Sequence, residues 1–110
     1  MKLEGQVAIV TGAGRNIGEA TCKLLASEGA TVIPCDKVGE NAKAVAEEVR
    51  KAGGRAEAYT LDITKGPDVR RVVQEVADKY KRIDILVNNA GFDDIRPFIE
   101  TTEQLSLIHI

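Results

Sequence analysis

A glycine-rich turn near the start of this 110-residue chain brings together residue types that can bind a phosphate. Four consecutive apolar residues, Val7 to Val10, precede Thr11-Gly12, and two more glycines follow at Gly14 and at Gly18, where an amphipathic stretch starts. Glycine lets the backbone turn tightly and approach a ligand without an intervening Cβ atom. The first N–H groups of a helix attract anions. The pattern therefore predicts a phosphate-binding turn between a buried strand and a helix.

A carboxylate follows the next apolar run. Thr31 to Cys35 have the pattern of a second strand, and Asp36 comes directly after it, eighteen residues beyond Gly18. At that place a carboxylate can accept hydrogen bonds from both ribose hydroxyls of an adenosine. A strand, a glycine turn, a helix, a strand and an acid are together typical of the βαβ unit that binds a dinucleotide. An ordinary strand–helix turn with helpful glycines is the alternative, and the acid at this spacing favours the dinucleotide.

Hydrophobic periodicity predicts four strands that alternate with three helices. The expected strands are 7–10, 31–35, 55–61 and 83–87, and the expected helices are 17–28, 38–52 and 67–80. In the first helix, Ile17, Ala20, Leu24 and Leu25 form the stripe expected to face the core. The alternation predicts an α/β fold, a doubly wound, Rossmann-like parallel sheet of order 3-2-1-4, truncated after its fourth strand. A TIM barrel shares the alternation, but its phosphate sites follow late strands.

Composition and charge exclude several classes of partner. The net charge is −2 and no basic block occurs, which argues against a nucleic-acid partner. No apolar run reaches transmembrane length, and the first residues lack the apolar core of a signal peptide, so we expect no membrane partner. Cys22 and Cys35 lack metal-ligand spacing, and His109 is the only histidine. We therefore expect reduced thiols, no metal site and a cytoplasmic location.

Four motifs, in chain order, make this chain resemble the short-chain dehydrogenase/reductase family. They are Thr11-Gly12 through Gly18, Asp36, Leu61-Asp62-Ile63 and Asn88-Asn89-Ala90-Gly91. The resemblance extends to about Thr102, and Asn-Asn-Ala-Gly after the fourth strand is its most specific part. The family's first motif is T-G-x-x-x-G-x-G, and here Asn16 replaces the middle glycine. Asparagine tolerates a positive φ better than most residues, so we expect Asn16 to keep the turn with φ above zero or close to it.

The resemblance implies a role for each matching residue. Gly12, Arg15, Asn16, Ile17 and Gly18 would surround the pyrophosphate and the adenosine ribose. Asp62 would accept a hydrogen bond from the adenine amino group, and Ile63 would cover the ring. Asn89, Ala90 and Gly91 would contact the ribose next to the nicotinamide.

The acid at the end of the second strand also bears on the choice of cofactor. Asp36 favours NAD over NADP, because its carboxylate would repel a 2′-phosphate. Arg15 and Lys37 act in the opposite direction, since each could reach such a phosphate. We therefore expect NAD as the cofactor, with NADP less favoured.

The family's catalytic serine and its Tyr-x-x-x-Lys motif follow Asn-Asn-Ala-Gly. In this chain, Ile63 stands four positions after Tyr59 and Asp84 stands four positions after Tyr80, so neither tyrosine begins that motif. The resemblance implies a homo-oligomeric enzyme that moves hydride between the nicotinamide and a carbonyl or secondary alcohol, with 3-oxoacyl thioesters among the open substrates. We expect residues 1–104 to be its incomplete cofactor-binding domain, inactive alone.

Two other functions remain open at this stage. One is a non-catalytic dinucleotide-binding module, and the other is a Rossmann-like epimerase or methyltransferase. The motif Asn88-Asn89-Ala90-Gly91 speaks against both.

The last residues, 105–110, read Leu-Ser-Leu-Ile-His-Ile, which is the translation of a sequencing-adapter sequence. We therefore expect a non-native tail that adds no element to the fold and leaves the apolar edge of the fourth strand bare. The alternative is a genuine apolar tail that pairs as a strand.

Overall fold

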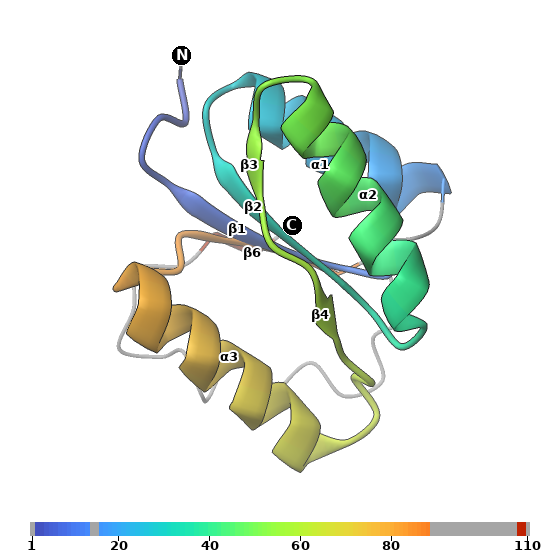
Figure 1. Ribbon diagram of the computed structural model, residues 1–110. Helices are drawn as coiled ribbons and strands as arrows, with labels where there is room; N and C mark the ends of the chain where they lie inside the picture. The colour runs from blue at the N-terminus through green and yellow to red at the C-terminus, as the bar shows by residue number, and fades with distance from the viewer. Residues whose placement is uncertain (1, 14–15, 89–107, 110) are drawn as a thin grey trace.

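The computed structural model describes residues 2–13, 16–88 and 108–109, and a parallel β-sheet forms its centre (Figure 1). The strands are β1 (Val7–Thr11), β2 (Thr31–Asp36), β3 (Arg55–Ala56), β4 (Tyr59–Thr60), β5 (Ile85–Asn88) and β6 (Ile108–His109). The helices of the described part are α1 (Asn16–Ser27), α2 (Gly39–Lys51) and α3 (Gly66–Tyr80). None of these helices has the length and apolar character that crossing a membrane requires.

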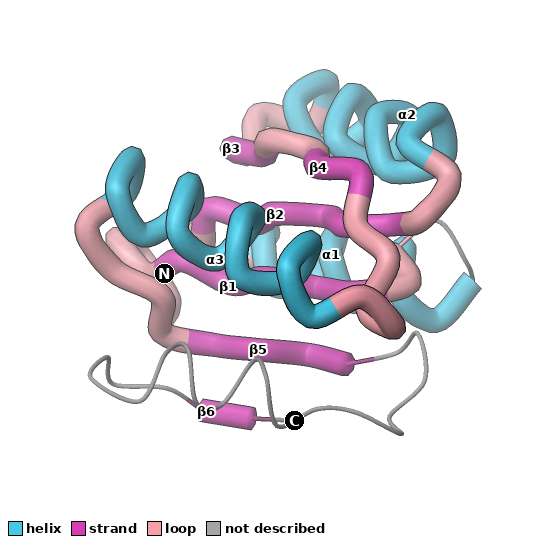
Figure 2. Tube along the Cα trace, turned by 90° about the horizontal axis from the view of Figure 1, so that it is seen from below, coloured by secondary structure: helices cyan, strands magenta, loops and turns pink. Residues whose placement is uncertain are grey.

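The strands lie in the order β3-β2-β1-β5-β6, all paired in parallel, and β4 also pairs with β2 (Figure 2). This arrangement confirms the predicted order 3-2-1-4 and the Rossmann-like α/β class. Parallel strands must be joined by crossovers, and helices supply them here. The carboxyl ends of β1, β2, β4 and β5 therefore meet at one edge of the sheet.

The third predicted strand, 55–61, is interrupted. Its two parts, β3 and β4, pair with β2 at Val32 and at Cys35, so Ile33 and Pro34 face the interruption. Proline has no N–H to donate to a neighbouring strand, which explains why the pairing stops here. On its other side, Pro34 remains in register with Val10 of β1.

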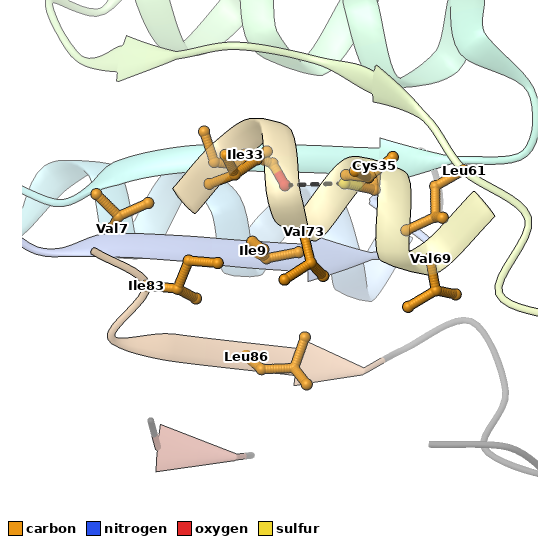
Figure 3. Packing of buried hydrophobic residues seen from close by; sticks show 11 residues of the cluster. Val7, Ile9, Ile33, Cys35, Leu61, Val69, Val73, Ile83 and Leu86 are labelled. Atoms are coloured by element: carbon orange, nitrogen blue, oxygen red, sulfur yellow. Dashed lines mark hydrogen bonds between the residues drawn. The ribbon is translucent and has the colours of Figure 1, made fainter. Parts of the chain in front are cut away.

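Helices cover both faces of the sheet: α1 and α2 lie on one face and α3 on the other (Figure 1). Alternate residues of β1 serve the two faces, as the strand period requires. Val7 and Ile9 pack with the valines of α3, as Figure 3 shows. Ala8 and Val10 join the cluster on the side of α1 and α2. Burial on both faces explains why these strands are continuous apolar runs.

Helix α1 is rotated relative to the predicted stripe. Ile17 and Leu24 are 73% and 64% exposed, while Cys22 is fully buried and Leu25 is partly buried. The prediction that Ile17, Ala20 and Leu24 face the core is therefore wrong, since Ala20 is exposed as well. The physical reason is Gly18, whose close contact with the preceding turn determines which side of the helix meets the sheet.

The end of the chain also differs from the prediction. Residues Ile108 and His109 form β6 and pair with Ile85 and Leu86 of β5. The expectations of a tail without structure and of a wholly bare β5 edge are therefore wrong in the described part. An open parallel edge presents unpaired N–H and C=O groups, and an extended apolar segment can satisfy them. Ser106, Leu107 and Ile110 lie outside the described residues.

Candidate functional site

The turn after β1 is tied to both neighbouring strands. Gly12 has a φ of 62°, in the left-handed region that glycine enters without strain. The N–H of Ala13 donates to the carbonyl oxygen of Cys35 at 3.1 Å, next to the end of β2. Thr11 Oγ1 donates to Asn88 Oδ1 at 2.8 Å, at the end of β5. These bonds hold the carboxyl ends of the three central strands together around the turn.

Helix α1 starts directly against this turn. A Cβ atom on Gly18 would lie 2.4 Å from the carbonyl oxygen of Gly12 and 2.8 Å from the Cα of Ala13. Only glycine allows this approach, which brings the first turn of α1 to the carboxyl edge of the sheet. The positive end of the helix and its first N–H groups then lie at this edge, an arrangement that can attract an anion.

Asn16 is the first residue of α1 and so belongs to a right-handed helix. The prediction that it takes a positive φ is therefore wrong, and among the described residues only Lys81 does so without being glycine. The physical reason is that Gly12 already supplies the left-handed turn, so Asn16 is left to begin the helix. The exposed side chain of Ile17 remains available to a ligand.

Asp36 ends β2 at the same edge and is 7% exposed. Its Oδ1 accepts a hydrogen bond of 2.9 Å from the Val38 N–H, which orients the carboxylate toward the loop before α2. Its carbonyl oxygen accepts the Leu61 N–H at 3.0 Å, so the chain that follows β4 is joined to the end of β2.

Asp62 and Ile63 follow β4, one strand further along the sheet. Asp62 Oδ1 accepts hydrogen bonds from Thr64 N–H at 2.9 Å and Thr64 Oγ1 at 2.6 Å. These bonds lower the pKa of the Asp62 carboxyl and keep it ionised at neutral pH. An ionised carboxylate is an acceptor only, as a base with an exocyclic amino group requires.

Four of the predicted residues, Gly12, Asp36, Asp62 and Ile63, line one pocket. A pocket of about 100 Å³ is lined by Gly12, Asp36, Lys37, Leu61, Asp62, Ile63 and Thr64. A wider hollow of about 1070 Å³ shares Lys37, Asp62 and Thr64 with it and extends to the start of α3. The pocket combines Gly12 of the turn, two carboxylates, one lysine and two apolar residues, which are groups of the kind that can contact a nucleotide.

Four predicted residues lie outside the described part of the chain: Arg15, Asn89, Ala90 and Gly91. Conversely, the sequence reasoning did not assign Thr64, whose position two residues after Asp62 is a signal for a local side-chain turn. In the described part, no group of histidine, cysteine and acidic side chains is arranged to hold a metal ion.

Comparison with known proteins shows what this chain is similar to. The profile of the short chain dehydrogenase family matches residues 6–108. The 3-oxoacyl-(acyl-carrier-protein) reductase FabG of Thermotoga maritima is 46% identical over 91 residues, which cover 83% of this chain and 37% of that protein.

Two solved structures share the fold as well as the sequence. A metagenomic short-chain oxidoreductase in complex with NADP has a TM-score of 0.80 and 40% identity, over 84% of this chain and 42% of that one. The NAD+-bound xylitol dehydrogenase has a TM-score of 0.79 and 39% identity, over 84% of this chain and 35% of that one. The chain thus spans about two fifths of the length of the relatives it matches.

Proposed function

Because this chain belongs to the short-chain dehydrogenase family, we propose that it is the cofactor-binding part of an NAD(P)-dependent oxidoreductase. The convergence of Gly12, Asp36 and Asp62 on one pocket is the observation that carries the proposal. The nicotinamide, when bound, supplies the hydride chemistry, and the protein binds and orients it. The reaction is hydride transfer between the nicotinamide and the carbonyl carbon of a small molecule.

The proposed roles are those that the family resemblance implies, and the positions of the described residues support some of them. Gly12 and Gly18 let the backbone approach the pyrophosphate, because a Cβ at Gly18 would collide with the turn. Asp36 accepts hydrogen bonds from the ribose hydroxyls of the adenosine half, Asp62 accepts one from the adenine amino group, and Ile63 covers the ring. The remaining proposed cofactor-binding residues are Arg15, Asn16, Ile17, Asn89, Ala90 and Gly91.

The cofactor is NAD in preference to NADP. Asp36 is buried beside the pocket, so its carboxylate would repel a 2′-phosphate with little water to screen the two groups. Lys37 lines the same pocket and favours the phosphate, which limits the expected preference. The two similar structures hold NADP in one case and NAD+ in the other.

The substrate class is a carbonyl compound or secondary alcohol, and a 3-oxoacyl thioester is one candidate because a relative is named a 3-oxoacyl-(acyl-carrier-protein) reductase. A cytoplasmic location is supported by Cys22 and Cys35, which are both buried free thiols. We also propose that the enzyme is a homo-oligomer, which sizing chromatography tests directly.

Titration of NADH and NADPH into the protein expressed from the whole gene tests the proposal. We expect NADH to bind more tightly. We expect Asp36→Ala to weaken NADH binding about tenfold, which corresponds to the free energy of one hydrogen bond to a charged group. The same change should strengthen NADPH binding. Asp78→Ala, which removes an exposed acid of α3, is the matched control and leaves both affinities unchanged.

Two results would contradict the proposal. If neither dinucleotide binds, the protein has no dinucleotide site and the proposal is refuted. Tight binding without oxidation of NADH by any of a panel of ketones and 3-oxoacyl thioesters would favour a non-catalytic binding module. For the 110-residue chain alone we expect binding without turnover, because neither Tyr59 nor Tyr80 is followed by a lysine in the required position.

A further inference from the structure

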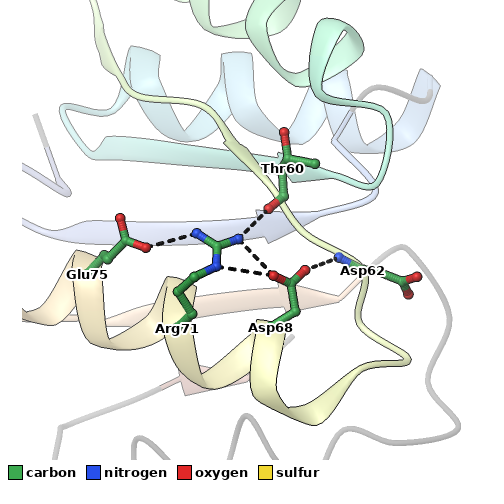
Figure 4. A network of polar contacts seen from close by, with 5 residues as sticks. All are labelled: Thr60, Asp62, Asp68, Arg71 and Glu75. Atoms are coloured by element: carbon green, nitrogen blue, oxygen red, sulfur yellow. Dashed lines mark hydrogen bonds and ion pairs between the residues drawn. The ribbon is translucent and has the colours of Figure 1, made fainter.

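Two side chains of α3, Asp68 and Arg71, form hydrogen bonds to the backbone at residues 60 and 62, beside the pocket (Figure 4). Asp68 Oδ2 accepts the Asp62 N–H at 2.8 Å. Arg71 Nη2 donates to the carbonyl oxygen of Thr60 at 3.1 Å and to Asp68 Oδ1 at 2.8 Å. The two side chains therefore hold both ends of the three-residue segment Thr60-Leu61-Asp62.

The pair is itself well anchored. Arg71 Nε makes a second bond to Asp68 Oδ1 at 3.2 Å, and Nη1 donates to Glu75 Oε2 at 2.9 Å. The guanidinium thus bridges two carboxylates of α3 and one backbone carbonyl. A planar group with several fixed donors holds its partners in one geometry, which a lysine ammonium cannot reproduce.

The held segment is the wall of the proposed adenine site. Leu61 is 2% exposed, and its N–H is bonded to the carbonyl oxygen of Asp36 on the other side. The direction of the Asp62 side chain from this backbone decides where its carboxylate lies. Thr64 occupies Oδ1, and no described residue bonds to Oδ2 in the structure, so Oδ2 is the acceptor available to a base.

Asp68 and Arg71 do not line the inner pocket of about 100 Å³; they line only the wider hollow beside it. Their influence on a base bound next to Asp62 and Ile63 therefore passes through the backbone of the held segment. This distinguishes them from the residues that touch the ligand.

We propose that Asp68 and Arg71 are positioning residues for adenine recognition: by fixing the backbone from Thr60 to Asp62, they aim the Asp62 carboxylate at the exocyclic amino group of the base. The inference deepens the proposed dinucleotide-binding function and rests on it. Its distinctive consequence concerns selectivity between bases rather than affinity alone. A carboxylate favours the amino group of adenine and repels the oxygen that replaces it in hypoxanthine.

The experiment uses the protein expressed from the whole gene. It compares the dissociation constant of NADH with that of reduced nicotinamide hypoxanthine dinucleotide. We expect the unaltered protein to prefer NADH about tenfold. Arg71→Met keeps the aliphatic stem and removes all the donors, and we expect it to reduce the preference to about twofold. Asp68→Ala should have the same effect, and Arg71→Lys should be intermediate.

Arg70→Met is the matched control. It removes the same charge one residue earlier on α3, and the Arg70 side chain makes none of these bonds. It should leave the preference unchanged. A thermal melt of every variant separates positioning from folding. If Arg71→Met or Asp68→Ala lowers the melting temperature while the NADH preference stays tenfold, the positioning role is overturned and only a structural one remains.

Two further outcomes separate this inference from the proposed function. If the unaltered protein binds both dinucleotides equally, Asp62 does not read the amino group, so the positioning inference fails and dinucleotide binding stands. If it binds neither, the proposed function fails as well. If Asp68→Ala does not fold, Arg71→Met carries the test alone, since Arg71 is half exposed and its substitution opens no cavity.

Discussion

Gly18 shows how one residue decides the position of a whole helix. The absent Cβ would lie within 2.4 Å of the Gly12 carbonyl oxygen, so the first turn of α1 is in contact with the loop that precedes it. The same contact rotates α1 so that Ile17 faces solvent and Cys22 faces the sheet. The glycine of the motif therefore serves packing, and we propose that the same contact lets the backbone approach the ligand.

We predict that Gly18→Ala lowers the free energy of unfolding by about 1–3 kcal/mol, because the new methyl group meets backbone atoms that cannot move aside. It should also weaken NADH binding, since α1 is displaced from the turn. Chemical denaturation and dinucleotide titration measure the two effects.

The control is Gly66→Ala, where the nearest atom to the added Cβ is the flexible end of Arg70 at 3.4 Å. We expect that variant to be neutral or slightly stabilising, because alanine favours the helix. Equal stability of Gly18→Ala and the unaltered protein would show that the turn and α1 are not in the contact described.

At the scale of single elements, Asp84 joins the residues before β5 to β1 through both its backbone and its side chain: its N–H donates to the Val7 carbonyl oxygen at 2.9 Å. The Val7 N–H donates to Asp84 Oδ2 at 2.9 Å, and Arg82 binds the same carboxylate through two bonds of 2.7 Å. Burial raises the pKa of Asp84, but the bonds from Arg82 and Val7 lower it further than burial raises it, so the pKa lies below its usual value.

We predict that Asp84→Ala lowers the free energy of unfolding at pH 7 by about 1–3 kcal/mol, since it leaves the nearly buried Val7 N–H without its acceptor. Because the folded pKa is depressed, this stabilisation is complete above the unfolded pKa of about 3.9 and is lost as the pH falls through the folded pKa. The difference between variant and parent should therefore narrow below about pH 4. Denaturation at several pH values, with Asp78→Ala as control, measures it; a difference that is constant with pH would refute the assignment.

Helix α3 ends at a residue in an unfavourable conformation. Lys81 caps it with φ 66° and ψ 11°, and its N–H donates to the Ala77 carbonyl oxygen at 2.9 Å. A side chain with a Cβ is strained in this left-handed region, whereas glycine is not. We predict that Lys81→Gly raises the free energy of unfolding by about 0.5 kcal/mol.

Lys51→Gly provides the opposite case, because Lys51 lies within the last turn of α2. That change should lower stability by about 0.5–1 kcal/mol. Thermal or chemical denaturation compares the two variants, and a loss of stability in both would mean that the Lys81 conformation is not strained.

At the scale of the whole molecule, the sheet has two unlike edges. On the β2 side, β3 and β4 together form a short, interrupted edge strand, and interruptions of this kind discourage pairing with another molecule. On the other side, β6 pairs only with Ile85 and Leu86 of β5. In the described part of the chain, the outer edge of the apolar strand β5 therefore pairs with two residues.

We predict that removal of residues 105–110 increases self-association, because it uncovers the whole outer edge of β5. Sizing chromatography with light scattering, over a range of protein concentrations, compares the shortened chain with the full one. The same monomeric mass for both chains at every concentration would show that β6 does not protect this edge.

The sequence by itself determined the fold class, the strand order and the four residues Gly12, Asp36, Asp62 and Ile63 that meet in one pocket. Each depends on local patterns: a period of two or 3.6, a glycine turn, or an acid directly after a strand. Short right-handed crossovers then leave little freedom in how parallel strands can be ordered. The resemblance to the family, carried by the same motifs, is confirmed by the match over residues 6–108.

Only the tertiary structure decided the features that depend on contacts between distant residues. The rotation of α1 follows from Gly18 meeting Gly12, and the break between β3 and β4 lies opposite Pro34 on another strand. The sequence offered the pairing of the tail as an alternative only, without a partner strand, and the bond from Arg71 to Thr60 has no signal in local spacing. The physical reason is that periodicity describes which face of an element is apolar, whereas the partner of that face is determined only when the elements pack together.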